Sequence, residues 1–342
     1  MRATIRDVAE AAGVSAMAVS KVLHGKGTNV RVSDAKAELI RKVARELHYR
    51  PNQNARNFRN QKTNLIGVVF QQFEGLTDDN PYLPQMLNGV MAALFPAGYT
   101  MGICPSLILD GNAPAIADGR FDGILWARPD FSAASVDSFR YCGVPVVMLH
   151  APTGSAEGIP TFCANNDLAM QRVVDHLYDL GHRKVAFVID PVPLLTAEGV
   201  ARRAAFERAA QSRNLDFEVL VVDQTEPDLT AYKSSNRPHT ALIAYSDTQA
   251  GGLLKAAEAL GIDVPGELSV VGFDSSTFCE RTKPRLTSVF QPVEQMARDA
   301  TNYLLTMVND AESTWRESGA VTSLYDCHLD VRESTGPCPP SN

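Results

Sequence analysis

The sequence predicts an α/β protein in which a small all-helical N-terminal module precedes a larger core of two lobes, each built on a doubly wound parallel sheet. Three observations predict this fold class. Apolar residues recur with a helical period in the first fifty residues. From residue 64 onward, apolar strand patterns alternate with amphipathic helix patterns. The length of 342 residues is enough for two or three compact units.

The first fifty residues predict three short helices. The segment Thr4-Ile5-Arg6-Asp7 has the spacing of a capping box, and Gly13 suits the left-handed turn that ends this first helix. Ser15 can cap a second helix. A third helix starts at Ser33-Asp34 and ends before Arg50-Pro51, because the residue before a proline disfavours helical backbone.

The second of these helices has a narrow apolar face and a polar outer face. Val19, Val22 and Leu23 point one way, and the opposite face consists of Ala16, Met17, Ser20, Lys21 and His24. A helix, a glycine turn and such a second helix form a helix-turn-helix unit, whose second helix can enter the major groove of DNA. Any small three-helix domain would share the apolar pattern, so charge is the discriminating observation.

The formal charge changes sign along the chain. Residues 1–62 carry thirteen Lys and Arg against five Asp and Glu, a charge of +8, whereas the remaining residues carry nineteen against thirty-four, a charge of −15. A basic module on an acidic body favours a polyanionic partner for the module alone. On charge alone, a solvated basic face without a partner is the alternative.

Composition excludes several classes of protein. Apolar residues make up 45% and charged residues 21%, which excludes global disorder. No apolar stretch reaches the ~18 residues of a membrane span, and the N-terminus lacks the apolar region of a signal peptide, so we expect a cytoplasmic protein. The six cysteines form no C-x-x-C pair, which indicates reduced thiols rather than disulfides or metal ligands. We expect no cofactor.

The N-terminal motifs resemble a known family. The run TIRDVAEAAGVSAMAVSKVLHG, followed by VRVSDAKAELIRKVARELHYRPNQNARNFR, resembles the headpiece of the LacI/GalR family of bacterial transcription regulators. The resemblance implies that one set of residues reads bases, namely Ala16, Met17, Ser20 and Lys21. It implies that a second set holds phosphates, namely Thr4, Ser15, Asn29 and Arg31. The loop 25–31 is a few residues longer than in the best-known members.

Residues 51–63 resemble the family's hinge helix, which enters the minor groove. The resemblance implies DNA contacts from Asn54, Ala55 and Phe58. The family usually has Leu at the position of Phe58, the apolar wedge that kinks a base step. A flexible polar linker is the alternative interpretation of this segment.

Alternating strands and helices follow. Strand patterns cover 65–70, 99–104, 121–126, 144–149, 184–189, 218–222, 240–245 and 268–273, and helix patterns cover 82–95, 167–180, 196–213, 248–260 and 291–308. This alternation predicts a doubly wound α/β core, in which ligands bind beyond the carboxyl ends of the strands. The strands are too many for one compact sheet of this length, so we expect two lobes.

The resemblance extends over nearly the whole chain and implies a periplasmic-binding-protein-like core with the effector between its lobes. Its landmarks include FDGILW, LGHRKVAFV and PRLTSVFQPVEQMARDA. The implied layout is a headpiece at 1–50, a hinge at 51–63, an N-lobe at 64–163 plus 291–322, a C-lobe at 164–290 plus 323–336, and a disordered tail at 337–342.

The family's effector-binding positions transfer residue by residue. They are Gln71, Phe73, Tyr82, Trp126, Asn165, Arg202, Ser246, Asp247 and Asp274. A guanidinium at Arg202 suits vicinal hydroxyls or a carboxylate, with Asp274 as the matching acceptor. The sequence departs from the family at Ala205, where Gly is usual, and at Ser246, where Asn is usual. The alternatives are a helix cap for Asp274, a surface ion pair for Arg202, and core packing for Trp126 or Phe73.

The resemblance implies an effector-responsive transcription regulator, most simply a repressor, that binds pseudo-palindromic operator DNA as a homodimer. Its effector would be a sugar or sugar derivative. The competing classes are a solute-binding protein and a sugar-converting enzyme on the same core. We expect no enzyme, because no G-x-S-x-G, Walker or G-x-G-x-x-G motif occurs and the seven histidines form no cluster.

Overall fold

The computed structural model describes residues 3–24, 30–50, 62–70, 82–104, 119–128, 131, 136–139, 142–222, 227–233, 238–310 and 321–340. Contacts divide the chain into two units, Met1–Thr63 and Asn64–Asn342. Some predicted site residues lie outside the described residues: Asn29, Asn54, Ala55, Phe58, Gln71 and Phe73. Among the described helices, none combines the length and the apolar composition that a membrane crossing requires.

The N-terminal unit contains the three helices that the sequence predicts. They are α1 (Ile5–Ala11), α2 (Ala16–His24) and α3 (Asp34–Glu46). The capping box forms at α1, where the Thr4 backbone N–H donates to the Asp7 carboxylate at 2.7 Å and the Thr4 hydroxyl accepts from the Asp7 backbone N–H at 3.4 Å. Gly13, between α1 and α2, has a φ of +62°, which glycine adopts without steric cost.

The three helices share a small apolar core. Val8, Val19 and Ile40, one from each helix, have no exposed surface and lie in one cluster. Ala18 and Ala44 fill the space between them. This core fixes the rotation of α2, so the face opposite Val19 turns outward.

Residues 64–342 form two sheets of six strands each. The first sheet has the order β11-β5-β4-β3-β1-β2, with every neighbouring pair parallel. Its strands are β1 (Leu65–Val69), β2 (Thr100–Ile103), β3 (Gly123–Trp126), β4 (Val146–Leu149), β5 (Thr161–Ala164) and β11 (Thr322–Tyr325). We call this sheet and the helices that cover it the N-lobe.

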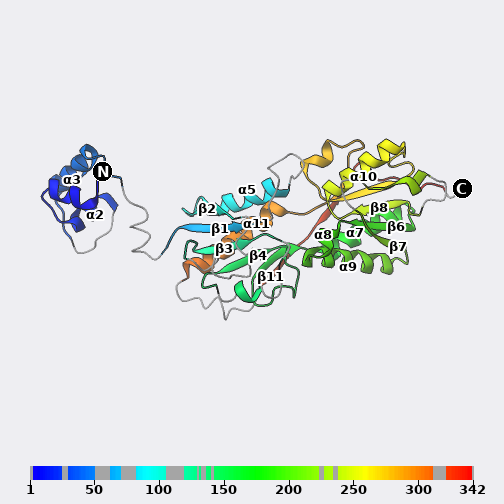
Figure 1. Ribbon diagram of the computed structural model, residues 1–342, viewed down its shortest axis with the longest axis horizontal. Coiled ribbons are helices and arrows are strands. Elements are labelled where there is room, and N and C mark those ends of the chain that lie inside the picture. Colours follow the sequence, from blue (N-terminus) through cyan, green and yellow to red (C-terminus); the bar gives the residue numbers. More distant parts are fainter. Residues whose placement is uncertain are drawn as a thin grey trace. The chain divides into compact units, whose positions relative to one another are not determined.

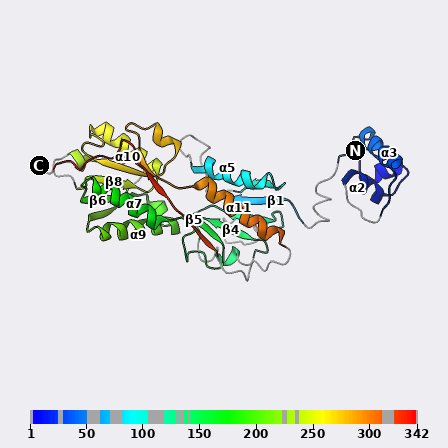
Figure 2. The ribbon, with the colours of Figure 1, turned by 180° about the vertical axis from the view of Figure 1, so that it is seen from behind.

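Two helices cover one face of the N-lobe sheet, α5 (Tyr82–Leu94) and α11 (Val293–Asn309), and they lie side by side (Figures 1 and 2). Their close approach depends on Gly89, because a Cβ there would lie 2.2 Å from the backbone oxygen of Glu294. The apolar cluster on this face joins Met86 of α5 and Met296 of α11 to the strands. A second cluster, which includes Trp126 and Phe139, covers the opposite face.

The second sheet has the order β12-β10-β9-β8-β6-β7, and only the edge strand β12 is antiparallel to its neighbour. Its strands are β6 (Lys184–Ile189), β7 (Asp216–Val221), β8 (Ala241–Ala244), β9 (Ser269–Asp274), β10 (Thr287–Phe290) and β12 (His328–Asp330). The helices α7 (Asn166–Asp179) and α9 (Ala197–Ser212) cover one face, and α10 (Asp247–Leu260) covers the other (Figure 1). We call this assembly the C-lobe, and the doubly wound fold class is confirmed.

The chain passes between the lobes at three places: after β5, after β10 and after β11. The predicted lobe boundaries need a small correction. β11 pairs in parallel with β5, with Thr322 opposite Thr161 and Tyr325 opposite Ala164, so Ala164 and the residues from 323 to 325 belong to the N-lobe sheet. Sequence patterns missed β5, β10, β11 and β12 because strands of three or four residues are too short to show a period.

The C-terminal segment is bound to the C-lobe, contrary to the expected disorder from residue 337. The Cys338 backbone N–H donates to the Leu180 carbonyl at 2.8 Å, and buried His182 contacts the Gly336 carbonyl through Nε2 at 3.1 Å. The proline-rich composition suggested disorder, but these backbone contacts order the described residues 337–340. Figure 2 shows this segment running along the C-lobe.

Candidate functional site

The outward face of α2 is the first candidate site. Ala16 and Met17 are exposed, and Met17 retains 61% of its accessible surface. Ser20 and Lys21 are half-buried on the same helix. An exposed methionine beside a small residue on a rigidly seated helix offers an apolar contact surface to a partner.

Lys21 is partly engaged within the N-terminal unit. Its Nζ donates to the Val30 carbonyl at 2.5 Å, which uses one of its three N–H groups. Thr4 and Ser15 both cap helices, since the Ser15 hydroxyl accepts from the Ala18 backbone N–H at 3.2 Å. Each hydroxyl keeps its own proton for donation to a phosphate oxygen. Arg31 is exposed.

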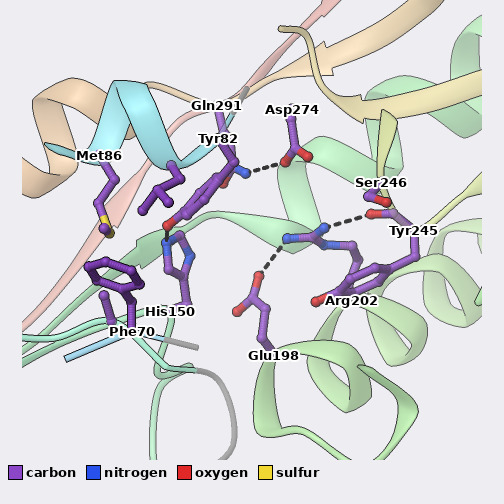
Figure 3. Close-up of a pocket in the computed structure, with 12 residues that line it drawn as sticks. Phe70, Tyr82, Met86, His150, Glu198, Arg202, Tyr245, Ser246, Asp274 and Gln291 are labelled. Carbon is purple, nitrogen blue, oxygen red and sulfur yellow. Dashed lines mark hydrogen bonds and ion pairs between the residues drawn. The ribbon is translucent and has the colours of Figure 1, made fainter. Parts of the chain in front are cut away.

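A cavity of about 160 Å³ between the lobes is the second candidate site (Figure 3). Its lining residues are Phe70, Tyr82, Leu83, Met86, Ala127, His150, Glu198, Arg202, Tyr245, Ser246, Asp274 and Gln291. Most of them follow the carboxyl end of a strand or begin a helix, as expected for ligand sites of doubly wound sheets. We call the N-lobe members from Phe70 to His150 the N-lobe wall, and the members from Glu198 to Asp274 the C-lobe wall.

Arg202 is the centre of the C-lobe wall. Its Nε donates to Asn166 Oδ1 at 3.0 Å, its Nη1 to the Tyr245 carbonyl at 2.8 Å, and its Nη2 to Glu198 Oε1 at 2.8 Å. The guanidinium also lies 3.6 Å from the ring centroid of Phe273. Only 3% of the residue is exposed, so this cation is held by protein partners on several sides.

Two buried oxygens at the cavity accept no hydrogen bond from any described residue. They are Glu198 Oε2 and Gln291 Oε1, and both residues are 2% exposed. The other polar atoms of these side chains are used: Glu198 Oε1 accepts from Arg202 and from Asn166, and Gln291 Nε2 donates to Asp274 Oδ1 at 2.5 Å. Figure 3 shows the free Glu198 oxygen turned away from Arg202.

Asp274 ends β9 in an unusual backbone conformation. Its φ is +119° and that of Ser275 is +43°, values that cost free energy in non-glycine residues and concentrate at functional sites. Burial raises the pKa of its carboxyl to about 8, and the charge of Asp247 adds to the shift, whereas Arg202 opposes it. The carboxyl is therefore an acid that can change its protonation state near neutral pH.

The N-lobe wall is apolar apart from one pair. Phe70, Leu83 and Met86 supply apolar surface, and the Tyr82 hydroxyl is hydrogen-bonded to His150 Nε2. Burial lowers the pKa of His150 to about 4 and raises that of Tyr82. Both side chains are therefore neutral at physiological pH.

The structure brings together four of the predicted effector residues: Tyr82, Arg202, Ser246 and Asp274 all line the cavity. The surface ion pair considered for Arg202 does not fit its burial. Ser246 also caps α10, accepting from the Gln249 backbone N–H at 3.3 Å. The role of these four cavity residues in effector binding stays a prediction.

Three predicted effector residues lie elsewhere. Trp126 packs in the core against Phe139, with ring centroids 4.7 Å apart, because alternation along β3 points it to the opposite face from Ala127, which lines the cavity. Asn165 caps α7, accepting from the Leu168 backbone N–H at 3.1 Å. The position of Trp126 fits the alternative interpretation given above, that it packs in the core.

Asp247 is 1% exposed and binds the loop after β9 instead of lining the cavity. Its Oδ2 accepts from the Ser276 backbone N–H at 2.9 Å and its Oδ1 from the Ser288 hydroxyl at 2.5 Å. Gly272 makes room for it, since a Cβ there would lie 2.4 Å from Oδ1. Asp247 therefore supports the backbone that carries Asp274.

Sequence reasoning missed much of the polar lining: His150, Glu198, Tyr245 and Gln291. His150 directly follows a predicted strand, Tyr245 ends one and Gln291 begins a predicted helix, and these positions could have singled them out. Glu198 lies four residues before Arg202, a spacing typical of helical ion pairs. Among the described residues, no group of three His, Cys, Asp or Glu side chains is placed to hold a metal ion.

Comparisons with known proteins agree with this architecture. The family model for bacterial regulatory proteins of the lacI family matches residues 4–52, and the model for a periplasmic binding protein-like domain matches residues 174–335. The HTH-type transcriptional repressor PurR of Vibrio parahaemolyticus is 30% identical over 330 residues, covering 91% of this chain and 93% of the relative. Catabolite control protein A of Staphylococcus xylosus is 28% identical over 324 residues, covering 91% and 94%.

Solved structures show the same fold. A complex of the transcriptional regulator CelR with cellobiose matches with a TM-score of 0.67 and 25% identity, over 97% of this chain and 100% of that one. A lac repressor dimer bound to operator matches with a TM-score of 0.81 and 20% identity, over 98% and 100%. The sequence relatives together with the helix-turn-helix match show that this chain belongs to the LacI family of bacterial regulatory proteins and is a DNA-binding transcription regulator.

Proposed function

We propose that the chain represses transcription as a homodimer on a pseudo-palindromic operator, and that a sugar-like ligand in the cavity between the lobes sets its operator affinity. The observation that carries the proposal is the occurrence, in one chain, of an exposed α2 face and a cavity with lining residues from both lobes. A C2 dimer presents two such faces to two half-sites.

The α2 face would read bases by contacts of two kinds. Met17 and Ala16 would offer apolar contact to a thymine methyl group, and the Lys21 ammonium would donate to guanine O6 and N7. Thr4, Ser15, Asn29 and Arg31 would bind phosphates and set the orientation. Asn54, Ala55 and Phe58 would contact the minor groove, with Phe58 as the wedge.

The cavity would couple ligand binding to DNA affinity through the lobe crossings. Gln291 lies between β10 and α11, on one crossing, and donates to Asp274 of the C-lobe wall. A ligand that contacts both walls in only one arrangement of the lobes shifts the population toward that arrangement. The match with a regulator solved in complex with cellobiose supports a sugar-like ligand.

We propose that the cavity binds its ligand without chemical conversion. The relatives are transcription regulators, and the basic side chain at the cavity, Arg202, is engaged with Asn166, Glu198 and Tyr245. Action on chromosomal DNA places the protein in the bacterial cytoplasm.

Selection of duplexes from a random pool, followed by affinity measurements against random competitor, tests the DNA part. We expect one pseudo-palindromic sequence to be preferred, with the logarithm of the binding constant falling by about 0.9 per phosphate contact for each tenfold rise in salt. A protein that prefers no duplex would contradict the proposal, and so would affinity that does not change with salt.

Two variants of exposed apolar residues in the N-terminal unit sharpen this test. Met17→Ala, on the α2 face, should weaken preference for the selected duplex by about 1 kcal/mol, roughly fivefold, through loss of apolar base contact. Leu39→Ala, on α3, is the matched control, since Leu39 is also exposed, at 43%. Equal losses in both variants would show that α2 is not the reading helix.

A further inference from the structure

We propose that the cavity selects a ligand that carries a protonated amine, and that Glu198 and Asp274 receive this amine. Within the sugar-like class proposed above, the simplest such ligand is an amino sugar. This inference rests on the proposed function, because it specifies the chemistry of the molecule that occupies the same cavity.

The first observation is that the buried groups without partners are acceptors. Glu198 Oε2 and Gln291 Oε1 accept no hydrogen bond from the described residues, and both side chains are almost fully buried. A buried polar group without a partner raises the free energy of the folded state, and a charged group raises it more. A ligand that donates hydrogen bonds recovers this free energy, whereas a ligand with only acceptors does not.

The second observation is the distribution of charge around the cavity. Its lining holds two carboxyl groups, Glu198 and Asp274, and one guanidinium, that of Arg202. His150 adds no positive charge, because burial lowers its pKa to about 4. At neutral pH the Asp274 carboxyl, whose pKa burial raises to about 8, is mostly protonated in the ligand-free protein, and the charges of Glu198 and Arg202 balance. A protonated amine beside Asp274 favours the ionised carboxylate, whereas a phosphate or carboxylate opposes it.

Arg202 cannot easily turn toward an anionic ligand. Its three donations go to Asn166, Tyr245 and Glu198 at 2.8–3.0 Å, and its guanidinium stacks on the rings of Phe273 and Tyr245 at 3.6 and 4.6 Å. Reorienting it would leave the Glu198 carboxylate buried without its cation, which is strongly destabilising. The unpartnered oxygen of the Glu198 carboxylate is thus the charged acceptor that a ligand donor can meet, while the two further N–H groups of Arg202, which donate to no described residue, can serve ligand oxygens such as hydroxyls.

The opposite wall fits a ring. Figure 3 shows Phe70 and Met86 on one side of the cavity and Glu198, Arg202 and Asp274 on the other. Apolar side chains pack against the C–H face of a sugar ring, so the ring would lie on the N-lobe wall. Its amine would then point to the acidic groups of the C-lobe wall.

The helix that carries Glu198 also carries a natural control. Arg203 and Glu207 also form an i,i+4 pair on α9, in the opposite order along the helix, with 2.8 Å between Nε and Oε1, but their side chains are 43% and 30% exposed. The Glu198–Arg202 pair has the same length and is 3% and 4% exposed. The two pairs have opposite order along the helix and differ in burial and in position at the cavity, so Glu207 is a control for the loss of a helical Glu–Arg ion pair away from the cavity.

The test is a thermal-shift and calorimetric panel on the full chain. The probes are glucose, galactose and mannose, each as the 2-amino-2-deoxy sugar, the N-acetylated amino sugar, the parent sugar and the 6-phosphate. We expect one or more free amines to stabilise the protein, and to bind at least about tenfold more tightly than the matched parent, acetylated and phosphorylated compounds, a difference of about 1.4 kcal/mol.

Three variants locate the preference. Glu198→Gln should reduce the affinity for the amine about tenfold or more and abolish the difference from the parent sugar, whereas Glu207→Gln should change neither. Because Glu198→Gln removes the ion partner of Arg202, Asp274→Asn serves as a second variant that keeps side-chain size and the acceptor for Gln291 Nε2. It should reduce the preference for the amine in the same direction.

Several results would overturn the inference: a parent sugar or a phosphate that binds as tightly as its amine, no stabilisation by any amine at millimolar concentration, or an amine preference that Glu198→Gln leaves intact. Operator binding measured in parallel separates these failures from failure of the proposed function. A neutral sugar that binds and alters operator affinity would refute only the preference for an amine. A protein that prefers no duplex would refute the proposed function itself.

Discussion

The C-lobe wall of the cavity is polar and internally hydrogen-bonded, whereas the N-lobe wall is mostly apolar. On the C-lobe wall, Arg202 is held by acceptors from α7, α9 and the end of β8. On the N-lobe wall, Met86 and Leu83 belong to the core that joins α5 to α11 and the sheet. The C-lobe wall therefore sets the direction of polar contacts before any ligand arrives, and the N-lobe wall supplies shape and removal of water.

This difference predicts that the two walls respond differently to mutation, and the largest effect is expected at Arg202. Arg202→Ala leaves the Glu198 carboxylate buried without its cation, so it should lower the free energy of unfolding by about 3–5 kcal/mol. Arg203→Ala breaks the exposed pair with Glu207 and should cost about 0.5 kcal/mol. Urea unfolding of both variants measures the difference.

Comparable losses in the two variants would show that the C-lobe wall is not a buried network. The expected loss also changes how Arg202→Ala should be used as a probe of effector binding. The variant removes a structural ion pair together with any ligand contact, so a lost ligand response has to be interpreted beside its measured stability.

The sequence predicted the fold better than the cavity, and individual residues show why. The capping box at Thr4 and the turn at Gly13 depend on neighbours in sequence, so local spacing was enough to predict them. Arg202 and Asp274 followed from the family resemblance. Trp126 was assigned to the cavity wrongly, because the face to which a short strand turns a side chain depends on register with neighbouring strands.

The sequence also did not reveal which side chains are buried or which hydrogen-bond partners they have. Asp247 and Asp274 are both acidic residues next to strand ends, but four hydrogen bonds tie Asp247 to the loop after β9 and to β10, whereas Asp274 lines the cavity. The i,i+4 spacing of Glu198 and Arg202 is visible in the sequence, but the burial of Glu198 at the cavity and its contact with Asn166 arise only in the folded C-lobe. Such tertiary contacts have no single-residue signature in sequence.

The walls should also titrate in opposite directions, with an effect on stability similar in size to that of Arg202→Ala. The folded-state pKa of Asp274 is about 8 and the unfolded value is about 3.9, so the folded chain holds a proton that the unfolded chain releases. Its contribution to the free energy of unfolding should fall as pH rises from about 4 to 8, by at most about 1.4 kcal/mol per pH unit. Asp274→Asn should remove this dependence.

His150 has the opposite sign. Its folded-state pKa of about 4 lies below the unfolded value of about 6.5, so its contribution is present above pH ~6.5 and is lost as pH falls toward 4. Between pH ~4 and ~6.5 the two contributions oppose each other, so His150→Gln should leave a fall in stability from about pH 4 to 8, and Asp274→Asn should leave a rise from about pH 4 to 6.5 followed by a flat profile. Denaturant unfolding of wild type and both variants across this range measures the two slopes, and parallel profiles for all three proteins would contradict the assignment.

The smallest effect is expected for a volume-conserving change on the N-lobe wall. Met86 is fully buried and lines the cavity, and Met307→Leu offers a control in the same apolar cluster away from the cavity. Met86→Leu should cost less than about 1.5 kcal/mol of stability, as Met307→Leu should, because both keep apolar volume.

If this wall contributes only shape and water exclusion, ligand affinity should change less than about threefold in either variant, a difference of about 0.65 kcal/mol. A tenfold loss in Met86→Leu alone, measured by calorimetry with the amine that binds, would instead show a directional contact from this wall. The two walls would then differ in charge, but both would orient the ligand through specific contacts.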